Sequence, residues 1–209
     1  MSNNLVITIG REFGSGGHEV GARLAKRLGI DFYDKELIDI AAEKSGCSEH
    51  FIRRNDERTP GIFARSVMFT KGNAYSHMSP EDDLFIHQTA IIKELGEKGP
   101  CVIVGRCADY VLREKRNVVK VFIHAPLDDR IRRKMALGTE GSTEKEVKKN
   151  ILTKEKVRER YYNFYTGSRW GDSRNYNLCI DTSKVGIDGA VEIIAAYVEH
   201  ERQHSILPD

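Results

Sequence analysis

The sequence lacks several features that would place the protein in a specialised class. No apolar run approaches the length of a membrane span, and the N-terminus has no signal-peptide core. The four cysteines, Cys47, Cys101, Cys107 and Cys179, show no paired metal-binding spacing. Cys101 and Cys179 lie within apolar runs, where we expect buried thiols. These absences argue against a membrane-spanning chain and favour a reducing, cytoplasmic setting.

Arrangements typical of covalent catalysis are also missing. No Ser/His/Asp or Cys/His arrangement is suggested, and the seven histidines show no metal spacing. We therefore name no metal site on the protein. The net charge of +2 points to neither a nucleic-acid polymer nor a membrane surface, and we expect neither partner. The sequence does not indicate an oligomeric state.

The 209 residues suit one α/β domain with inserted segments, and they contain no internal repeat. Apolar runs predict strands at residues 5–9, 30–33, 101–105, 118–124 and 177–180. Helices are predicted at residues 18–28, 35–44, 48–55, 80–97, 127–137, 143–162 and 187–203. Residues 56–78 show no clean period. The alternation of strands and helices predicts a mainly parallel sheet with helices on both faces.

The chain is organised around its opening strand, a glycine-rich turn over residues 10–17, and a helix beginning near His18. Glycines in such a turn allow positive φ, and backbone N–H groups can then point inward. Together with the positive end of the helix, these groups can hold a polyphosphate. The alternative is a β-to-α turn without a ligand. The predicted phosphate-binding residues are Gly14, Ser15, Gly16, Gly17, His18 and Glu19.

This turn departs from the usual phosphate-loop pattern, which ends in Gly-Lys-Ser/Thr. Gly17 stands where the lysine is expected, and Glu19 falls near the position of the hydroxyl residue. The cation that assists catalysis must therefore come from elsewhere. Arg11 and His18 are the nearest candidates.

Ligands of parallel α/β sheets bind beyond the carboxyl ends of the strands. Arg106 follows the strand at residues 101–105 and is therefore expected to face the cleft, where its guanidinium can bind a phosphate. The alternative is a surface ion pair, for example with Asp109.

Residues 130–160 contain eleven Lys or Arg and five Glu, a net charge of +6. Two basic helices joined by the break at 138–142 resemble a lid that closes over phosphates. The alternative is an ordinary solvated helix pair. The aromatic residues of 161–170 could stack a base, but we favour packing of a loop onto the core.

Several motifs together resemble the cytidylate kinase family of nucleoside monophosphate kinases, in particular its cytidylate kinase-like branch. They are Gly-Arg-Glu-Phe-Gly-Ser-Gly-Gly at 10–17, Tyr-Asp-Lys-Glu-Leu-Ile at 33–38, Gly-Arg at 105–106, the helix at 125–135, the Tyr-Tyr to Trp-Gly-Asp to Asn-Tyr series at 161–176, and Cys-Ile-Asp-Thr-Ser at 179–183. The resemblance covers nearly the whole chain apart from residues 56–78. It implies a three-layer P-loop NTPase fold in one domain of residues 1–209, with an acceptor-binding helical insert at 34–98 and lid helices at 127–162.

The resemblance also implies an activity, namely transfer of the ATP γ-phosphoryl group to a nucleoside monophosphate such as CMP or dCMP, with Mg²⁺ bridging phosphates. It places ATP phosphates at residues 14–18. The acceptor-binding residues it implies are Asp34, Lys35 and Arg106, and the lid arginines are Arg130, Arg133 and Arg158. Asp109, which follows the same strand as Arg106, is a further candidate for acceptor binding.

Three functions remain open at this stage. The first is an active kinase that prefers a CMP-like acceptor. The second is a kinase of the same fold with a different small acceptor. The third is a nucleotide-binding protein that has lost turnover together with the loop lysine. The retained basic lid favours an enzyme, because a pure binding protein has little use for several cleft cations.

Overall fold

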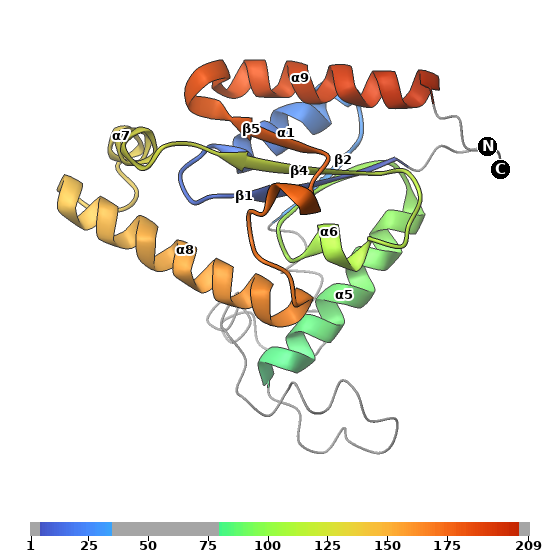
Figure 1. Ribbon diagram of the computed structural model, residues 1–209, viewed down its shortest axis with the longest axis horizontal. Helices are drawn as coiled ribbons and strands as arrows, with labels where there is room; N and C mark the ends of the chain where they lie inside the picture. The colour runs from blue at the N-terminus through green and yellow to red at the C-terminus, as the bar shows by residue number, and fades with distance from the viewer. Residues whose placement is uncertain (1–4, 35–79, 205–209) are drawn as a thin grey trace.

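The computed structural model describes residues 5–34 and 80–204, and these residues form a five-stranded parallel sheet (Figure 1). The strands are β1 (Val6–Arg11), β2 (Asp31–Tyr33), β3 (Cys101–Val104), β4 (Val118–His124) and β5 (Leu178–Asp181). Their order is β2-β3-β1-β4-β5. Because every pairing is parallel, the carboxyl ends of all strands lie at one edge of the sheet, where ligands bind in such folds.

Helices cover both faces of the sheet (Figure 1). One face packs against α1 (Gly17–Leu28) and α9 (Thr182–His204), and it includes the fully buried Ile7 and Ile9 of β1. The other face packs against α5 (Pro80–Lys98) and the short α6 (Ala108–Val111), and it includes Val6 and Ile103. The alternation along β1 thus sends successive side chains into two separate cores. The three-layer α/β prediction is confirmed.

Two further helices, α7 (Leu127–Leu137) and α8 (Glu144–Thr166), pack side by side beyond the carboxyl end of the sheet (Figure 1). Helix α7 ends at Gly138, which has a left-handed φ of 63°. Helix α8 begins with a capping box, in which Thr143 and Glu146 satisfy each other's backbone N–H groups. These signals explain why the end of α7 and the start of α8 were predictable. A 3₁₀ turn, η2 (Ser173–Asn175), precedes β5.

The structure corrects the sequence prediction in three places and adds a short helical piece before the last helix. Helix α9 is interrupted at the non-helical Gly186 (φ 70°, ψ −177°), so its longer piece begins at Ile187 as predicted and a shorter piece precedes it from Thr182. Helix α6 and η2 are too short for a periodic pattern to reveal. Cys179, expected to be buried, is exposed, because β5 is an edge strand.

Among the described residues, no helix is long and apolar enough to cross a membrane.

Part of the sequence prediction lies outside the described residues. This applies to the helices at 35–44 and 48–55, the segment at 56–78, and Lys35. Most of the expected insert at 34–98 falls there as well, and only Asp34 and α5 represent it in the structure.

Candidate functional site

The glycine-rich loop connects β1 to α1 and is held by side chain–backbone hydrogen bonds. The Ser15 hydroxyl donates to the carbonyls of Glu12 (2.9 Å) and Ile123 (3.1 Å), and the Thr182 hydroxyl donates to the carbonyl of Ser15 (2.7 Å). Gly16 caps α1 in the left-handed region (φ 87°), where a side chain would be strained. The first N–H groups of a helix lack intrahelical acceptors, so the anchored loop presents a positively polarised helix end.

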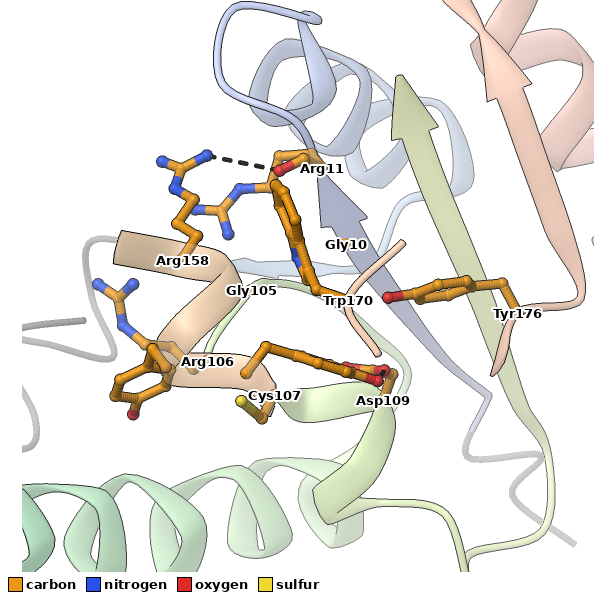
Figure 2. A pocket seen from close by; sticks show the side chains of 11 residues that line it. Gly10, Arg11, Gly105, Arg106, Cys107, Asp109, Arg158, Trp170 and Tyr176 are labelled. Carbon is orange, nitrogen blue, oxygen red and sulfur yellow. Dashed lines mark hydrogen bonds between the residues drawn. The ribbon is translucent and has the colours of Figure 1, made fainter. Parts of the chain in front are cut away.

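The side chain of Arg11 explains why position 17 is glycine rather than lysine. A Cβ at Gly17 would lie 2.5 Å from the Cβ of Arg11 and 3.0 Å from its Cγ. A Cβ at Gly105 would lie 2.1 Å from the Arg11 Nη1. Arg11 therefore runs across two glycines, from the start of α1 to the end of β3 (Figure 2). Its guanidinium lies between the loop and the turn after β3.

The turn after β3 has an unusual backbone. Gly105, Arg106 and Cys107 all have positive φ, of 82°, 57° and 55°. Two consecutive non-glycine residues in this region are uncommon and are typical of functional sites. The Arg106 residue is only 6% exposed, so the alternative of a surface ion pair does not apply.

Asp34 brings several predicted residues together at the end of β2. Its Oδ2 lies 3.0 Å from the Nε2 of His18, which belongs to the first turn of α1. Burial favours a higher pKa for Asp34, but the hydrogen bond with His18 and the positive charges of Arg11 and Arg106 outweigh it and lower the pKa. The structure thus gathers one carboxylate and three basic side chains from β1, α1 and the β3 turn.

A pocket, here called the β3-side pocket, opens beside this group (Figure 2). Asp109 of α6 is buried at its wall and accepts a hydrogen bond from the Tyr162 hydroxyl (2.6 Å). Burial raises the pKa of Asp109, although the bond from Tyr162 opposes the rise. From α8, Arg158 Nη1 donates to the Arg11 carbonyl at 3.5 Å. The pocket is lined by Gly10, Arg11, Gly105, Arg106, Cys107, Asp109, Arg158, Tyr161, Tyr162, Trp170 and Tyr176.

The aromatic series of residues 161–170, at the end of α8 and just beyond it, has two roles. Tyr165 stacks on Phe85 of α5 with a ring separation of 3.7 Å, and Tyr161 packs edge-on against both rings. This is the packing role favoured from the sequence. Trp170, by contrast, packs edge-on against Phe122 and lines the β3-side pocket.

A second pocket, here called the β5-side pocket, lies where the loop meets the ends of β4 and β5. It includes Gly14 and Ser15 of the loop together with Arg133 of α7. The glycine-rich loop therefore contributes residues to two pockets, one with the turn after β3 and one with the ends of β4 and β5. The β5-side pocket is lined by Gly14, Ser15, Ala125, Asp129, Arg133, Thr182, Ser183, Gly186 and Ile187.

The lid arginines contact the loop through carboxylates. Arg130 forms ion pairs with Glu155 of α8 and with Glu12 (Nε to Oε2 3.5 Å), and its Nη1 donates to the carbonyl of Phe13 (3.2 Å). Arg133 pairs with Glu19 of α1. The predicted phosphate contacts of these two arginines stay predictions, since in the structure Arg130 pairs with Glu12 of the loop and Glu155 of α8, and Arg133 pairs with Glu19 of α1.

The sequence did not single out Phe13, whereas Lys134 and Lys154 were among the basic residues flanking the break at 138–142 that were expected to face phosphates. Both lysines lie over the Phe13 ring, with Nζ atoms 4.6 and 4.4 Å from its centroid. An aromatic residue inside a glycine-rich loop was the available signal, because such a loop has little core to bury it.

The ligands implied by the fold can be tested against these residues. The positive end of α1 and the cations of α7 and α8 suit a polyphosphate. No group of three or more His, Cys, Asp or Glu in the described part of the chain could hold a metal ion. Mg²⁺ is commonly bound through substrate phosphates together with one or two carboxylates, and so it does not require such a group.

A parallel sheet of this strand order, with a glycine-rich loop after its central strand, gives the protein the fold of the P-loop kinases. Shikimate kinase from Bacteroides thetaiotaomicron shares the fold at 14% identity, with a TM-score of 0.56 and coverage of 93% of this chain and 98% of that one. The sequence profile of the cytidylate kinase-like family matches residues 6–184. The chain belongs to the cytidylate kinase-like family.

Relatives of known sequence and structure agree with this assignment. The cytidylate kinase of Pyrococcus horikoshii is 28% identical over 201 residues, which cover 95% of this chain and 90% of the relative. A solved structure of an uncharacterized protein from Eubacterium ventriosum is 34% identical, with a TM-score of 0.70 and coverage of 93% and 98% of the two chains.

Proposed function

We propose that the protein transfers the γ-phosphoryl group of ATP to a nucleoside monophosphate, with CMP or dCMP as the first acceptors to test. The observation that carries this proposal is the path of Arg11, which links the phosphate loop to the Asp34 and Arg106 group. A cation at that junction suits the charge that develops between donor and acceptor oxygens during transfer. The names of the curated relatives, cytidylate kinases at 25–34% identity, support the choice of acceptor.

In this proposal the loop residues 14–19 hold the donor phosphates, with the rest of ATP toward the β5-side pocket. Asp34, Arg106 and Asp109 hold the acceptor at or beside the β3-side pocket, and Lys35, which lies outside the described residues, is expected to bind the acceptor as well. The lid at 127–162 brings Arg133 and Arg158 to the phosphates and excludes water. Mg²⁺ bound to the phosphates supplies charge neutralisation. We further expect a cytoplasmic enzyme, as the cysteine usage indicates.

One observation favours the alternative of binding without turnover. Glu12, Glu19 and Glu155 already pair with the lid arginines, so phosphates must compete with protein carboxylates for them. ATP binding that leaves these pairs intact would hold the nucleotide without completing the catalytic site. A kinase that uses a different small acceptor is the other alternative, because residues 35–79 of the expected acceptor insert lie outside the described part.

A coupled ADP-release assay across a panel of acceptors tests the proposal. The panel should include CMP, dCMP, other nucleoside monophosphates, shikimate and gluconate, and calorimetry with ATP should accompany it. Turnover with CMP or dCMP supports the proposal. Turnover only with another acceptor would make the protein a kinase for that acceptor instead. ATP binding without any turnover would make it a nucleotide-binding protein instead of an enzyme.

Replacement of Arg106 by Ala should weaken monophosphate binding at least tenfold. The physical reason is the loss of a charge-assisted contact worth about 1.5–3 kcal/mol, where about 1.4 kcal/mol is a factor of ten. Calorimetry with the acceptor gives the measurement. Arg113→Ala, which removes a half-exposed arginine just beyond α6, is the matched control. Equal affinities of Arg106→Ala and the wild type would remove Arg106 from the acceptor site.

A further inference from the structure

Phe13 stands at the turn of the phosphate loop with cations of both lid helices around its ring. The ammonium groups of Lys134 (α7) and Lys154 (α8) lie 4.6 and 4.4 Å from the ring centroid, and the Arg158 guanidinium lies 5.1 Å from it. These distances fall within the range of cation–π attraction. Although the loop has no lysine at position 17, two lysines from the lid therefore lie beside it.

The ring is fixed in place by the lid itself. Phe13 packs against the small apolar cluster of Ile131, Val147 and Ile151, which joins α7 to α8. Its carbonyl accepts the hydrogen bond from Arg130 Nη1 at 3.2 Å. Because its ring packs against the cluster and its carbonyl is hydrogen-bonded, Phe13 can act as a platform whose position does not depend on the lysine side chains.

The two lysines share one carboxylate among the residues that the structure describes. Glu140 lies in the turn between the lid helices, with Oε2 2.6 Å from Lys154 Nζ and Oε1 3.9 Å from Lys134 Nζ. Burial lowers the pKa of Lys134, Glu140 opposes this, and the charges of Lys154, Arg133 and Arg158 lower it further. The surroundings of Lys134 therefore favour the arrival of an anion.

Lys134 also lies next to the glycines of the loop. A Cβ at Gly14 would meet the Cγ of Lys134 at 3.4 Å, and one at Gly16 would meet the guanidinium carbon of Arg133 at the same distance. Lys154 is tied to the same place through the Phe13 ring and Glu140, which it shares with Lys134.

We propose that Phe13 is a positioning residue that holds Lys134 and Lys154 beside the loop, and that the two lysines bind the donor's phosphate chain in place of a loop lysine. The ligand class is a polyphosphate, either of a nucleoside triphosphate or free. This inference rests on the proposed function, because it assigns the charge that the donor site needs.

Calorimetry with ATP and with inorganic tripolyphosphate tests the inference on the full chain. We expect Lys134→Met and Lys154→Met each to weaken both ligands about tenfold, and Phe13→Leu about fivefold, while Phe13→Tyr retains affinity. Lys156→Met is the matched control, because residues two positions apart on α8 do not share a face, and it should stay within about twofold. When Phe13→Leu is added to the double variant Lys134→Met/Lys154→Met, we expect no further loss of affinity, since a positioning residue acts through the groups it positions.

The outcomes separate this inference from the proposed function. If the wild type binds neither ATP nor tripolyphosphate, both fall together. If the wild type binds and turns over, but the two lysine variants bind like Lys156→Met, the inference alone falls. An independent, additive effect of Phe13→Leu overturns its positioning role. Should Phe13→Leu fail to fold, as judged by circular dichroism, Phe13→Tyr and the lysine variants still decide the result.

Discussion

Introducing the customary loop lysine, as Gly17→Lys, should reduce kcat/KM at least about 100-fold rather than improve it. The new Cβ would lie 2.5 Å from the Cβ of Arg11, and an atom so close to a main chain cannot rotate away. The end of β1 and the start of α1 would have to separate, and displacements near 1 Å at a reacting centre are enough for losses of about 10²-fold. Steady-state kinetics with the best acceptor, together with thermal unfolding, provide the measurement.

Two further variants make this result specific. Gly99→Lys is the matched control, because a Cβ there meets nothing within 4 Å, and it should leave activity near the wild-type value. Arg11→Gly combined with Gly17→Lys removes the overlapping Cβ and moves the cation to position 17. This pair should regain thermal stability and part of the lost activity. A Gly17→Lys protein as active as the wild type would show that Arg11 does not occupy this space.

The loop and the sheet were predictable because their signals are local. An apolar strand, closely spaced glycines and an amphipathic helix follow one another within residues 5–28, and the structure gives them as β1, loop and α1. The capping box at Thr143 and the glycine at position 138 likewise marked the lid helices within the chain itself.

The path of Arg11 could not be predicted, because it depends on a residue far along the chain. Its side chain fits only since both Gly17 and Gly105 lack a Cβ, and the turn at Gly105 comes beside the loop through the pairing of β1 with β3. The cations of residues 130–160 posed a similar problem. Composition gave their number, but the packing of Phe13 against both lid helices decides which lysines face the loop.

Replacement of Arg130 by Met should destabilise the protein by about 3 kcal/mol, the low end of the cost of breaking a buried pair, because it leaves two partly buried carboxylates without their cation. The Arg130 side chain is 7% exposed and lies between Glu155 (14%) and Glu12 (26%). Arg132→Met is the matched control on the same helix. Arg132 is 74% exposed and pairs with Asp129, so its loss should change stability by less than about 1 kcal/mol. Urea unfolding of both variants measures the difference.

The effect of Arg130→Met should also depend on pH. Burial raises the pKa of Glu155, Arg130 opposes this, and Glu12 adds to it, so without Arg130 the pKa rises further. A carboxyl with a higher pKa in the folded state binds its proton more tightly there. The free energy of unfolding therefore falls as pH rises above about 4.3, the pKa of a glutamate in the unfolded chain. The variant should lose more stability at pH 8 than at pH 5.5, and Glu155→Gln should restore part of it. An equal loss at both pH values would mean that Arg130 acts by packing rather than by its charge.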